Sequence, residues 1–186
     1  MKIIIAITGA SGSLYVGEFL NITAKSGVEV HGIISPTGEK VLKLEEGMDA
    51  RDLTAVSCWY RFDDFTAPMA SGSSNYDAMV VLPCSMGSLA AIATGYSGNL
   101  IHRAADVILK EDKKLILAIR ETPFNRNHIK NMLKAHDAGA VVYPIMPAFY
   151  HNPQNLRGMA FHFSGRLAEH LGLQVDGLSR WHGQAG

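Results

Sequence analysis

The sequence has little of what marks several large classes of protein. It has two cysteines, Cys58 and Cys84, and neither stands in a CxxC pair or at a spacing typical of metal ligands. A disulfide between them is possible, but two cysteines in a chain so rich in core residues are more simply interpreted as cytosolic thiols. Basic residues are not in excess: 17 Lys and Arg balance 17 Asp and Glu, so we expect no nucleic-acid partner. Any anionic ligand must be bound by a few local basic side chains.

Motifs of metal and nucleotide chemistry are also missing. The eight histidines form no HExxH or similar pattern, which predicts no metal site. There is no P-loop and no G-x-S-x-G elbow. The uncharged stretch 78–101 has the length of a membrane span, but Pro83, three glycines and several hydroxyls favour a strand, a loop and a buried helix. The apolar start M-K-I-I-I-A-I-T-G is too short for a signal peptide, so we expect a cytoplasmic protein without membrane association.

Apolar runs alternate with helical patterns along the 186 residues, 47% of which are hydrophobic. The expected strands are 2–8, 28–34, 78–82, 115–119 and 141–143, and the expected helices are 14–26, 38–44, 88–96, 101–111, 128–137 and 154–171. This alternation predicts an α/β fold, a doubly wound parallel sheet with right-handed crossovers. No repeat or linker interrupts it, so we expect a single domain over residues 1–186.

The most informative segment is the apolar run 114–119, which ends abruptly in Arg120-Glu121-Thr122-Pro123. A parallel strand buried on both faces cannot hide an ion pair, so these charges stand where open α/β sheets bind ligands. Pro123 is expected to end the strand and to open a helix. The alternative is a solvated strand cap.

Glycines and hydroxyls follow three of the other expected strands. Residues 9–13 (G-A-S-G-S) allow a tight turn before a helix, whose free N–H groups could bind a phosphate. The spacing is not the dinucleotide fingerprint G-x-G-x-x-G, which favours a mononucleotide over NAD, although an ordinary turn is equally compatible. Ser35 and Ser85 suit the edges of a flavin ring and are equally good helix caps.

A rigid aromatic loop, 143–151, follows the last strand, and Arg166 lies on the helix after it. The Tyr150 hydroxyl and the Arg166 guanidinium could together bind an anion. For Arg166 alone, a surface position on the helix is the simpler interpretation.

Taken together, these segments resemble the flavin prenyltransferase family, the UbiX-like proteins, which are homologous to flavin-dependent cysteine decarboxylases. The matching motifs occur in family order: I-T-G-A-S-G (7–12), A-S-G-S (70–73), L-P-C-S-M (82–86), L-A-A-I-A-x-G-Y-S-x-N-L (89–100), R-A-A-D-V-I-L-K-E (103–111), R-E-T-P (120–123), N-M (131–132), P-A-F-Y-H-x-P (147–153) and R-W (180–181). They span nearly the whole chain, and several are long.

The resemblance implies a flavodoxin-like Rossmann fold that binds FMN, and a homo-oligomer that is a dodecamer. It also implies a metal-independent reaction, in which reduced FMN receives a dimethylallyl group from dimethylallyl phosphate, at N5 and then at C6. The product, prenylated FMN, would serve a partner decarboxylase.

The resemblance also implies roles for individual residues. FMN would be held by Gly9, Ala10, Ser11, Ser35, Ser85, Met86, Gly87, Ser88 and Arg120. The substrate phosphate would be bound by Tyr150 and Arg166, with Arg103 and Lys110 arriving from a neighbouring subunit. Glu121 and Ser11 would manage protons, Glu45 would be a lesser acidic participant, and Trp181 would cover the allyl group. An indole face stabilises the positive charge that develops on such a group.

The sequence departs from the family pattern at a few places. Gly87-Ser88 stands where a Lys-Thr pair is usual, which removes a positive side chain from the flavin loop. Gly98 replaces a common acidic residue, and 124–127 (F-N-R-N) replaces a more apolar run.

Two other functions remain as alternatives. One is a flavin-dependent decarboxylase, but those relatives carry a P-x-S-A-N-T-like loop, where this chain reads P-C-S-M-G-S at 83–88. The other is a flavin carrier without catalysis, which would leave Glu121, Tyr150 and Arg166 without an evident purpose.

Overall fold

Isoleucine, valine and leucine fill the central strands, which are buried on both faces, as a parallel sheet covered by helices requires. The computed structural model describes residues 1–181. Its strands are β1 (Lys2–Ile7), β2 (Glu29–Ile34), β3 (Cys58–Tyr60), β4 (Ala78–Cys84), β5 (Lys114–Ile119) and β6 (Val141–Val142). They form one parallel sheet in the order β3-β2-β1-β4-β5-β6. The direction of winding reverses between β1 and β4, the point where such sheets bind ligands.

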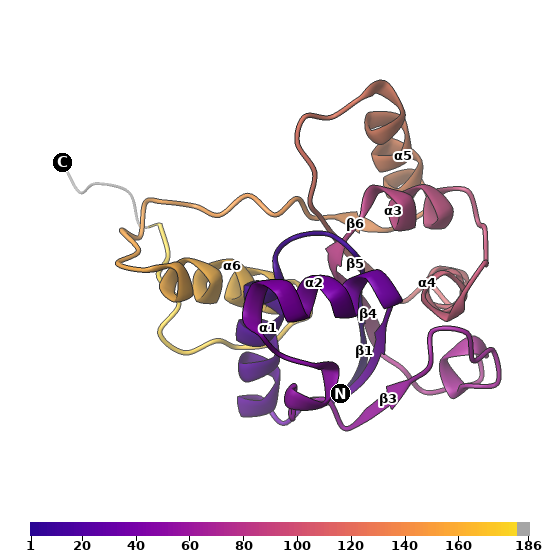
Figure 1. The fold of residues 1–186 in the computed structure, drawn as a ribbon, viewed down its shortest axis with the longest axis horizontal. Helices are drawn as coiled ribbons and strands as arrows, with labels where there is room; N and C mark the ends of the chain where they lie inside the picture. Colours follow the sequence, from indigo (N-terminus) through magenta and orange to yellow (C-terminus); the bar gives the residue numbers. More distant parts are fainter. Residues whose placement is uncertain (182–186) are drawn as a thin grey trace.

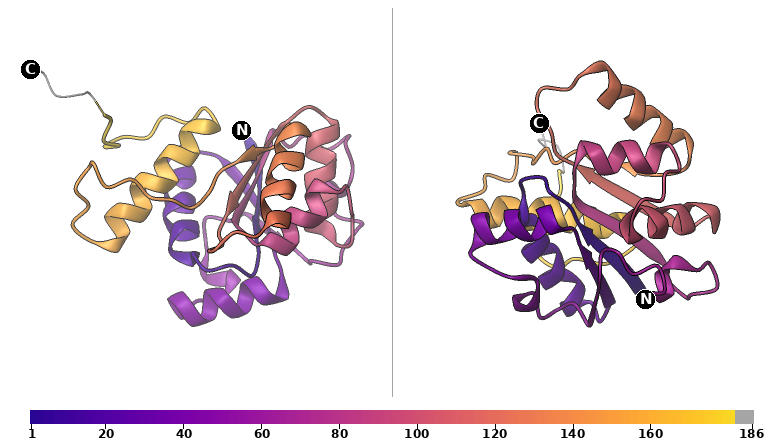
Figure 2. Two further views of the ribbon diagram at one scale, coloured as in Figure 1. Left: turned by 90° about the horizontal axis from the view of Figure 1, so that it is seen from above. Right: turned by 45° about the vertical axis from the view of Figure 1, so that its right-hand side comes forward.

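Helices cover both faces of this sheet (Figures 1 and 2). The α-helices in residues 1–181 are α1 (Ser13–Lys25), α2 (Pro36–Glu46), α3 (Met86–Ala93), α4 (Leu100–Lys110), α5 (Arg126–Asp137) and α6 (Leu156–His170), with short 3-10 turns η1 (Ala50–Asp52) and η2 (Pro68–Ala70). Successive side chains of a strand point to opposite faces, so β1 contributes to two cores. Ile3, Ile5 and Ile7 pack with α1 and α6, whereas Ile4 and Ala6 pack with α3, α4 and α5.

The predicted α/β fold and its doubly wound parallel sheet are confirmed, and all five expected strands are present. The stretch 78–101 forms β4, α3 and the start of α4, and no described helix is long and apolar enough to cross a membrane. The edge strand β3 was not expected, because its three half-buried residues carry no clear pattern.

The expectation that Pro123 opens a helix is wrong. The helix α5 begins only at Arg126, because the Asn125 side chain is its cap and accepts a hydrogen bond from the His128 N–H at 3.0 Å. Residues 120–125 therefore form a loop that carries Arg120 and Glu121 along the carboxyl edge of the sheet.

Candidate functional site at the carboxyl edge of the sheet

Thr8 joins the two loops that meet at the switch point between β1 and β4. Its buried hydroxyl donates to the Pro83 carbonyl oxygen at 2.8 Å and accepts from the Ser85 N–H at 2.8 Å. The Thr8 N–H also donates to the Pro83 oxygen at 3.2 Å. The loop after β4 is thereby held against the glycine loop after β1.

The glycine loop itself is closed by Glu45 from the end of α2. One carboxylate oxygen of Glu45 accepts from the N–H groups of Gly12 at 2.9 Å and Ser13 at 2.8 Å. Burial alone would raise the pKa of Glu45, but the Ser11 hydroxyl and these N–H groups outweigh it and hold the pKa below its usual range. The expectation that the start of α1 offers free N–H groups to a phosphate is therefore corrected for Gly12 and Ser13, whose N–H groups an internal carboxylate already binds.

Ser35 and Ser85, which the sequence suggested either as flavin contacts or as helix caps, are helix caps. The Ser35 hydroxyl accepts from the Gly38 N–H at 3.0 Å, and the Ser85 hydroxyl accepts from the Ser88 N–H at 3.3 Å. Gly9 is required here, because a side chain on it would collide with Thr37 at the start of α2. The Thr37 side chain thus packs directly on the Gly9 backbone, which brings the loops after β1 and β2 close together.

Met86 and Gly87, at the start of α3, line a hollow of about 490 Å³ between α3 and α5. A Cβ atom added at Gly87 would meet nothing within 4 Å, so this position has room for a longer side chain. Arg120 is exposed beside this loop, and its N–H donates to the Cys84 carbonyl oxygen at 3.2 Å. The half-buried Glu121 follows it and accepts from the Thr122 N–H at 3.0 Å.

The expected anion-binding pair Tyr150 and Arg166 lies in a second place, where both line a hollow of about 350 Å³ in front of α6. We call it the α6 hollow. Its remaining wall is formed by Val142, Tyr143, Pro144, Met146, Ala148, His162 and Phe163. Trp181 stands edge-on to the Tyr150 ring, with 5.7 Å between the ring centroids. The structure thus brings together three residues that the sequence places far apart.

The C-terminal segment 175–181 is docked along α6 by an ion pair and by apolar packing. Glu169 forms ion pairs with both Arg166 and Arg180. Leu178 packs against Gly165, where an added Cβ would come within 2.7 Å of it.

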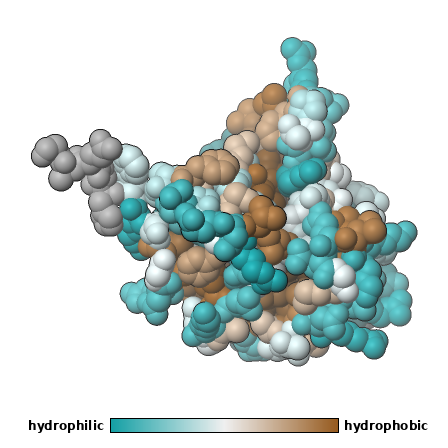
Figure 3. Space-filling view, turned by 60° about the vertical axis from the view of Figure 1, so that its left-hand side comes forward, coloured by the Kyte–Doolittle hydropathy of each residue, from teal (hydrophilic) through white to brown (hydrophobic). Residues whose placement is uncertain are grey.

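Apolar side chains are also exposed on the surface around α6. In the space-filling view that turns this side of the molecule toward the reader, apolar surface lies between polar regions (Figure 3). Exposed apolar side chains of this part of the chain are Met146, Phe149, Tyr150, Leu156 and Trp181.

The other two expected phosphate ligands are not in the α6 hollow of the same chain. Arg103 and Lys110 lie on α4, which covers the opposite face of the sheet from α6 (Figure 2). Arg103 donates to the Ala70 carbonyl oxygen at 3.0 Å and pairs with Asp106 at 2.8 Å, and Lys110 pairs with Glu111. Within one chain, the four expected phosphate ligands therefore form two separate groups. One is Tyr150 with Arg166 at the α6 hollow, and the other is Arg103 with Lys110 on α4.

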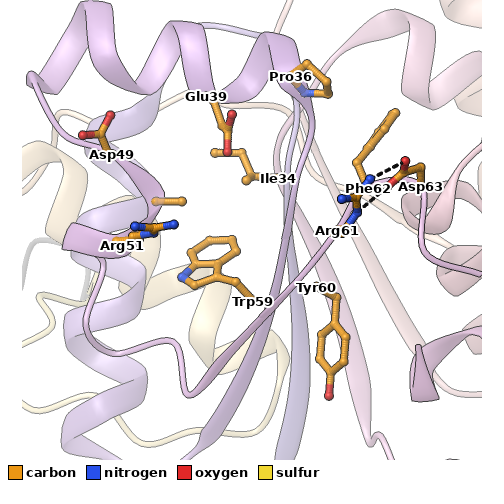
Figure 4. A pocket seen from close by; sticks show the side chains of 11 residues that line it. Ile34, Pro36, Glu39, Asp49, Arg51, Trp59, Tyr60, Arg61, Phe62 and Asp63 are labelled. Atoms are coloured by element: carbon orange, nitrogen blue, oxygen red, sulfur yellow. Dashed lines mark hydrogen bonds and ion pairs between the residues drawn. The ribbon is translucent and has the colours of Figure 1, made fainter. Parts of the chain in front are cut away.

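A larger hollow of about 730 Å³ lies elsewhere, between α2, η1 and the edge strand β3 (Figure 4). Its wall includes Trp59 and the Arg61–Asp63 ion pair, and it contains none of the expected site residues. Choosing a candidate site by volume alone would therefore have selected a hollow without any of the expected site residues.

Two other kinds of chemistry, metal binding and cysteine nucleophilicity, can be examined in the described residues. In residues 1–181 no group of three or more His, Cys, Asp or Glu is placed to hold a metal ion. Cys58 and Cys84 are both free thiols. Complete burial raises the pKa of Cys84 to about 12, so this thiol stays protonated near neutral pH and is a poor nucleophile.

Sequence reasoning missed three residues that organise these sites: Thr8, His162 and Glu169. Thr8 stood within a motif, but nothing indicated that its hydroxyl joins two loops. Glu169 lies three residues after Arg166 on α6, and this i, i+3 spacing was a usable signal for an ion pair. His162 had no signal, because its partners Tyr150 and Ser179 come from other parts of the chain.

Comparison with known proteins agrees with this arrangement. A family model described as Flavoprotein matches residues 1–161. The flavin prenyltransferase UbiX of Methanocaldococcus jannaschii is 46% identical over 182 residues, covering 97% of this chain and 98% of that relative. The crystal structure of AnUbiX in complex with FMN and dimethylallyl pyrophosphate superimposes on this chain with a TM-score of 0.96 and 36% sequence identity. The match covers 98% of each of the two chains.

A dodecameric FMN-dependent UbiX-like decarboxylase from Escherichia coli O157:H7 is 37% identical to this chain, with a TM-score of 0.95 and coverage of 98% of this chain and 100% of that one. These similarities extend over nearly the whole length of the relatives, and they include the loops at the carboxyl edge and the segment around α6. The chain belongs to the flavoprotein family and, within it, to the UbiX-like flavin prenyltransferases.

Proposed function

We propose that this chain transfers a dimethylallyl group from dimethylallyl phosphate to reduced FMN, at N5 and then at C6, and that the prenylated FMN serves a partner decarboxylase. The observation that carries the proposal is the α6 hollow, in which a phenol and a guanidinium line one space beside an exposed indole. A phosphate needs such donors, and an allyl cation needs such a ring. The similarity to AnUbiX, whose complex contains FMN and a prenyl donor, supports the same pairing of ligands.

The residues at the carboxyl edge fit FMN. Gly9, Ala10 and Ser11 bring backbone close to the switch point, and the α3 N-terminus with Met86 and Gly87 faces a hollow. Arg120 adds an exposed positive charge at the same edge, suited to the phosphate of FMN. The remaining proposed contacts are Ser35, Ser85 and Ser88. When bound here, reduced FMN supplies the nucleophilic N5 and C6 positions.

The chain's own residues would bind the donor and control protons around it. Tyr150 and Arg166 would bind the donor phosphate, whose negative charge grows as it leaves, and fixed donors stabilise that charge most where water is excluded. Trp181 would cover the allyl group. Glu121 and Ser11 would hold or move protons at the flavin edge, while Glu45 keeps Ser11 and the glycine loop in position.

The proposed site is completed by a second copy of the chain. Arg103 and Lys110 are on the far side of the sheet from the α6 hollow, so they reach a phosphate there only from a neighbouring subunit. Exposed apolar side chains around α6, among them Phe149 and Leu156, suit burial in such an interface. We therefore propose a homo-oligomer, and a dodecamer like that of the Escherichia coli relative.

The test is a reaction without metal. The purified protein is mixed anaerobically with reduced FMN and dimethylallyl phosphate, and the extracted flavin is weighed by mass spectrometry. A gain of one five-carbon unit supports the proposal, and Tyr150→Phe is expected to reduce it. A parallel reaction with the pyrophosphate shows which donor is preferred. Flavin that co-purifies but stays unmodified with both donors contradicts the proposal and favours a decarboxylase or a carrier.

A further inference from the structure

His162 forms part of the wall of the α6 hollow, and none of the roles above uses it. Its side chain is buried, with 4% of the residue exposed. The Nε2 atom lies 3.2 Å from the Tyr150 hydroxyl oxygen and 3.0 Å from the Ser179 carbonyl oxygen. One ring nitrogen thus contacts both the proposed phosphate ligand and the C-terminal segment that leads to Trp181.

The carbonyl oxygen decides which way these hydrogen bonds run. A carbonyl oxygen can only accept, so Nε2 of His162 must carry the proton. A protonated ring nitrogen has no lone pair to accept with, so the Tyr150 hydroxyl cannot donate to it. The Tyr150 oxygen therefore shares the Nε2–H of His162 with the Ser179 oxygen, and the proton of Tyr150 remains available to another acceptor.

We propose that His162 is a positioning residue, which holds its proton on Nε2 so that the Tyr150 hydroxyl donates into the α6 hollow, toward the phosphate of the donor substrate. The proposal deepens the proposed function and rests on it for the identity of that anion. A phosphate at neutral pH mainly accepts hydrogen bonds, so a tyrosine that donated to histidine instead would be lost as a ligand.

Two further contacts keep the His162 ring in this orientation. His151 stacks on it face to face, with 3.8 Å between the ring centroids and 10° between the planes. The Tyr150 ring stands edge-on to His162 at 5.4 Å and 87°. The same histidine also fixes Ser179, two residues before Trp181, so the phosphate ligand and the indole share one anchor.

Kinetics of three variants test the proposal. His162→Phe keeps an aromatic ring but removes the donor, and we expect it to raise the KM for dimethylallyl phosphate about tenfold with little change in kcat. His162→Gln places an amide N–H near the position of Nε2 and should recover most of the loss. In a Tyr150→Phe background, His162→Phe should add nothing, because the hydroxyl that it orients is gone. His136→Phe, on the exposed side of α5, is the matched control and should leave the KM unchanged.

Additive losses in the double variant, or a His162→Gln that is as impaired as His162→Phe, would overturn the proposal, since a purely structural role predicts both. Two measurements separate its failure from a failure of the proposed function. Solid-state ¹⁵N NMR of histidine-labelled protein, assigned by the signal lost in His162→Gln, should show the proton on Nε2; a proton on Nδ1 alone refutes the proposal. Calorimetry with inorganic phosphate should show weaker binding to His162→Phe than to the wild type, and equal binding also refutes it. Neither measurement requires prenyl transfer.

Discussion

Replacing Thr8 with valine removes one hydroxyl and leaves the shape of the side chain almost unchanged, so it isolates the hydrogen bonds that join the two loops at the switch point. The Ser85 N–H loses its partner at 2.8 Å, and leaving such a part-buried donor unsatisfied costs about 1–3 kcal/mol. The Pro83 oxygen loses a second donor but keeps the Thr8 N–H, which adds about 1 kcal/mol. We expect a total destabilisation of about 2–4 kcal/mol, or a Tm lower by about 5–15 °C for a chain of this size.

Thr23→Val is the matched control for this variant. Thr23 is also fully buried, but its hydroxyl donates only to the Leu20 carbonyl oxygen one turn earlier on α1, a local bond that adds little to helix stability. Thermal and urea unfolding of both variants should be compared at one protomer concentration, because subunit association also affects Tm. If Thr8→Val and Thr23→Val lower stability equally, the hydroxyl does not join the loops as described. Thr8→Val should also weaken FMN binding, whereas Thr23→Val should not.

Three further predictions concern single residues at the carboxyl edge. Gly87→Lys should tighten FMN binding by a few-fold in low salt, because the position has open space and a lysine adds a positive charge. Flavin fluorescence measures the affinity. An unchanged affinity would show that this loop does not face the FMN phosphate. Glu121→Gln should keep FMN bound but slow prenylation, and wild-type turnover would remove its proton-handling role. Folding lowers the pKa of Glu45, so its stabilisation is full above the ordinary glutamate range and is lost as the pH falls through the lowered value. Glu45→Gln should therefore lower Tm at pH 7 but much less at pH 3, and an equal loss at both would contradict this.

Most of the fold could be predicted because the central strands are continuous apolar runs that end in turn residues. The run 114–119 is an example: it is buried from Leu115 to Ile119, and the exposed Arg120 follows immediately. The strand β3 and the start of α5 could not be predicted in this way. The first is too short for a pattern, and the second depends on Asn125, a cap that competes with Pro123 as a helix start.

At the carboxyl edge, the residue patterns could predict the site only as far as strand ends indicate it. Glycines and hydroxyls after β1, β2 and β4 are brought to one edge by the parallel topology, as expected. The internal anion at the start of α1 was not foreseeable, because Glu45 reaches Gly12 across 33 positions of sequence. The same holds for the partners of His162. Contacts of this kind depend on the tertiary structure, and residue type alone does not indicate them.

The central claim is that one prenyl-transfer site is built from two chains, and complementation tests it most directly. One variant lacks Arg103 and Lys110 (both to Ala), and the other lacks Tyr150 and Arg166 (to Phe and Ala). Each is expected to assemble and bind FMN but to leave it unmodified. When the two variants are co-expressed, some interfaces combine the intact α4 of one chain with the intact α6 hollow of the other. The extracted flavin should then gain one five-carbon unit. Mixed oligomers that form and bind FMN but leave it unmodified would contradict the claim.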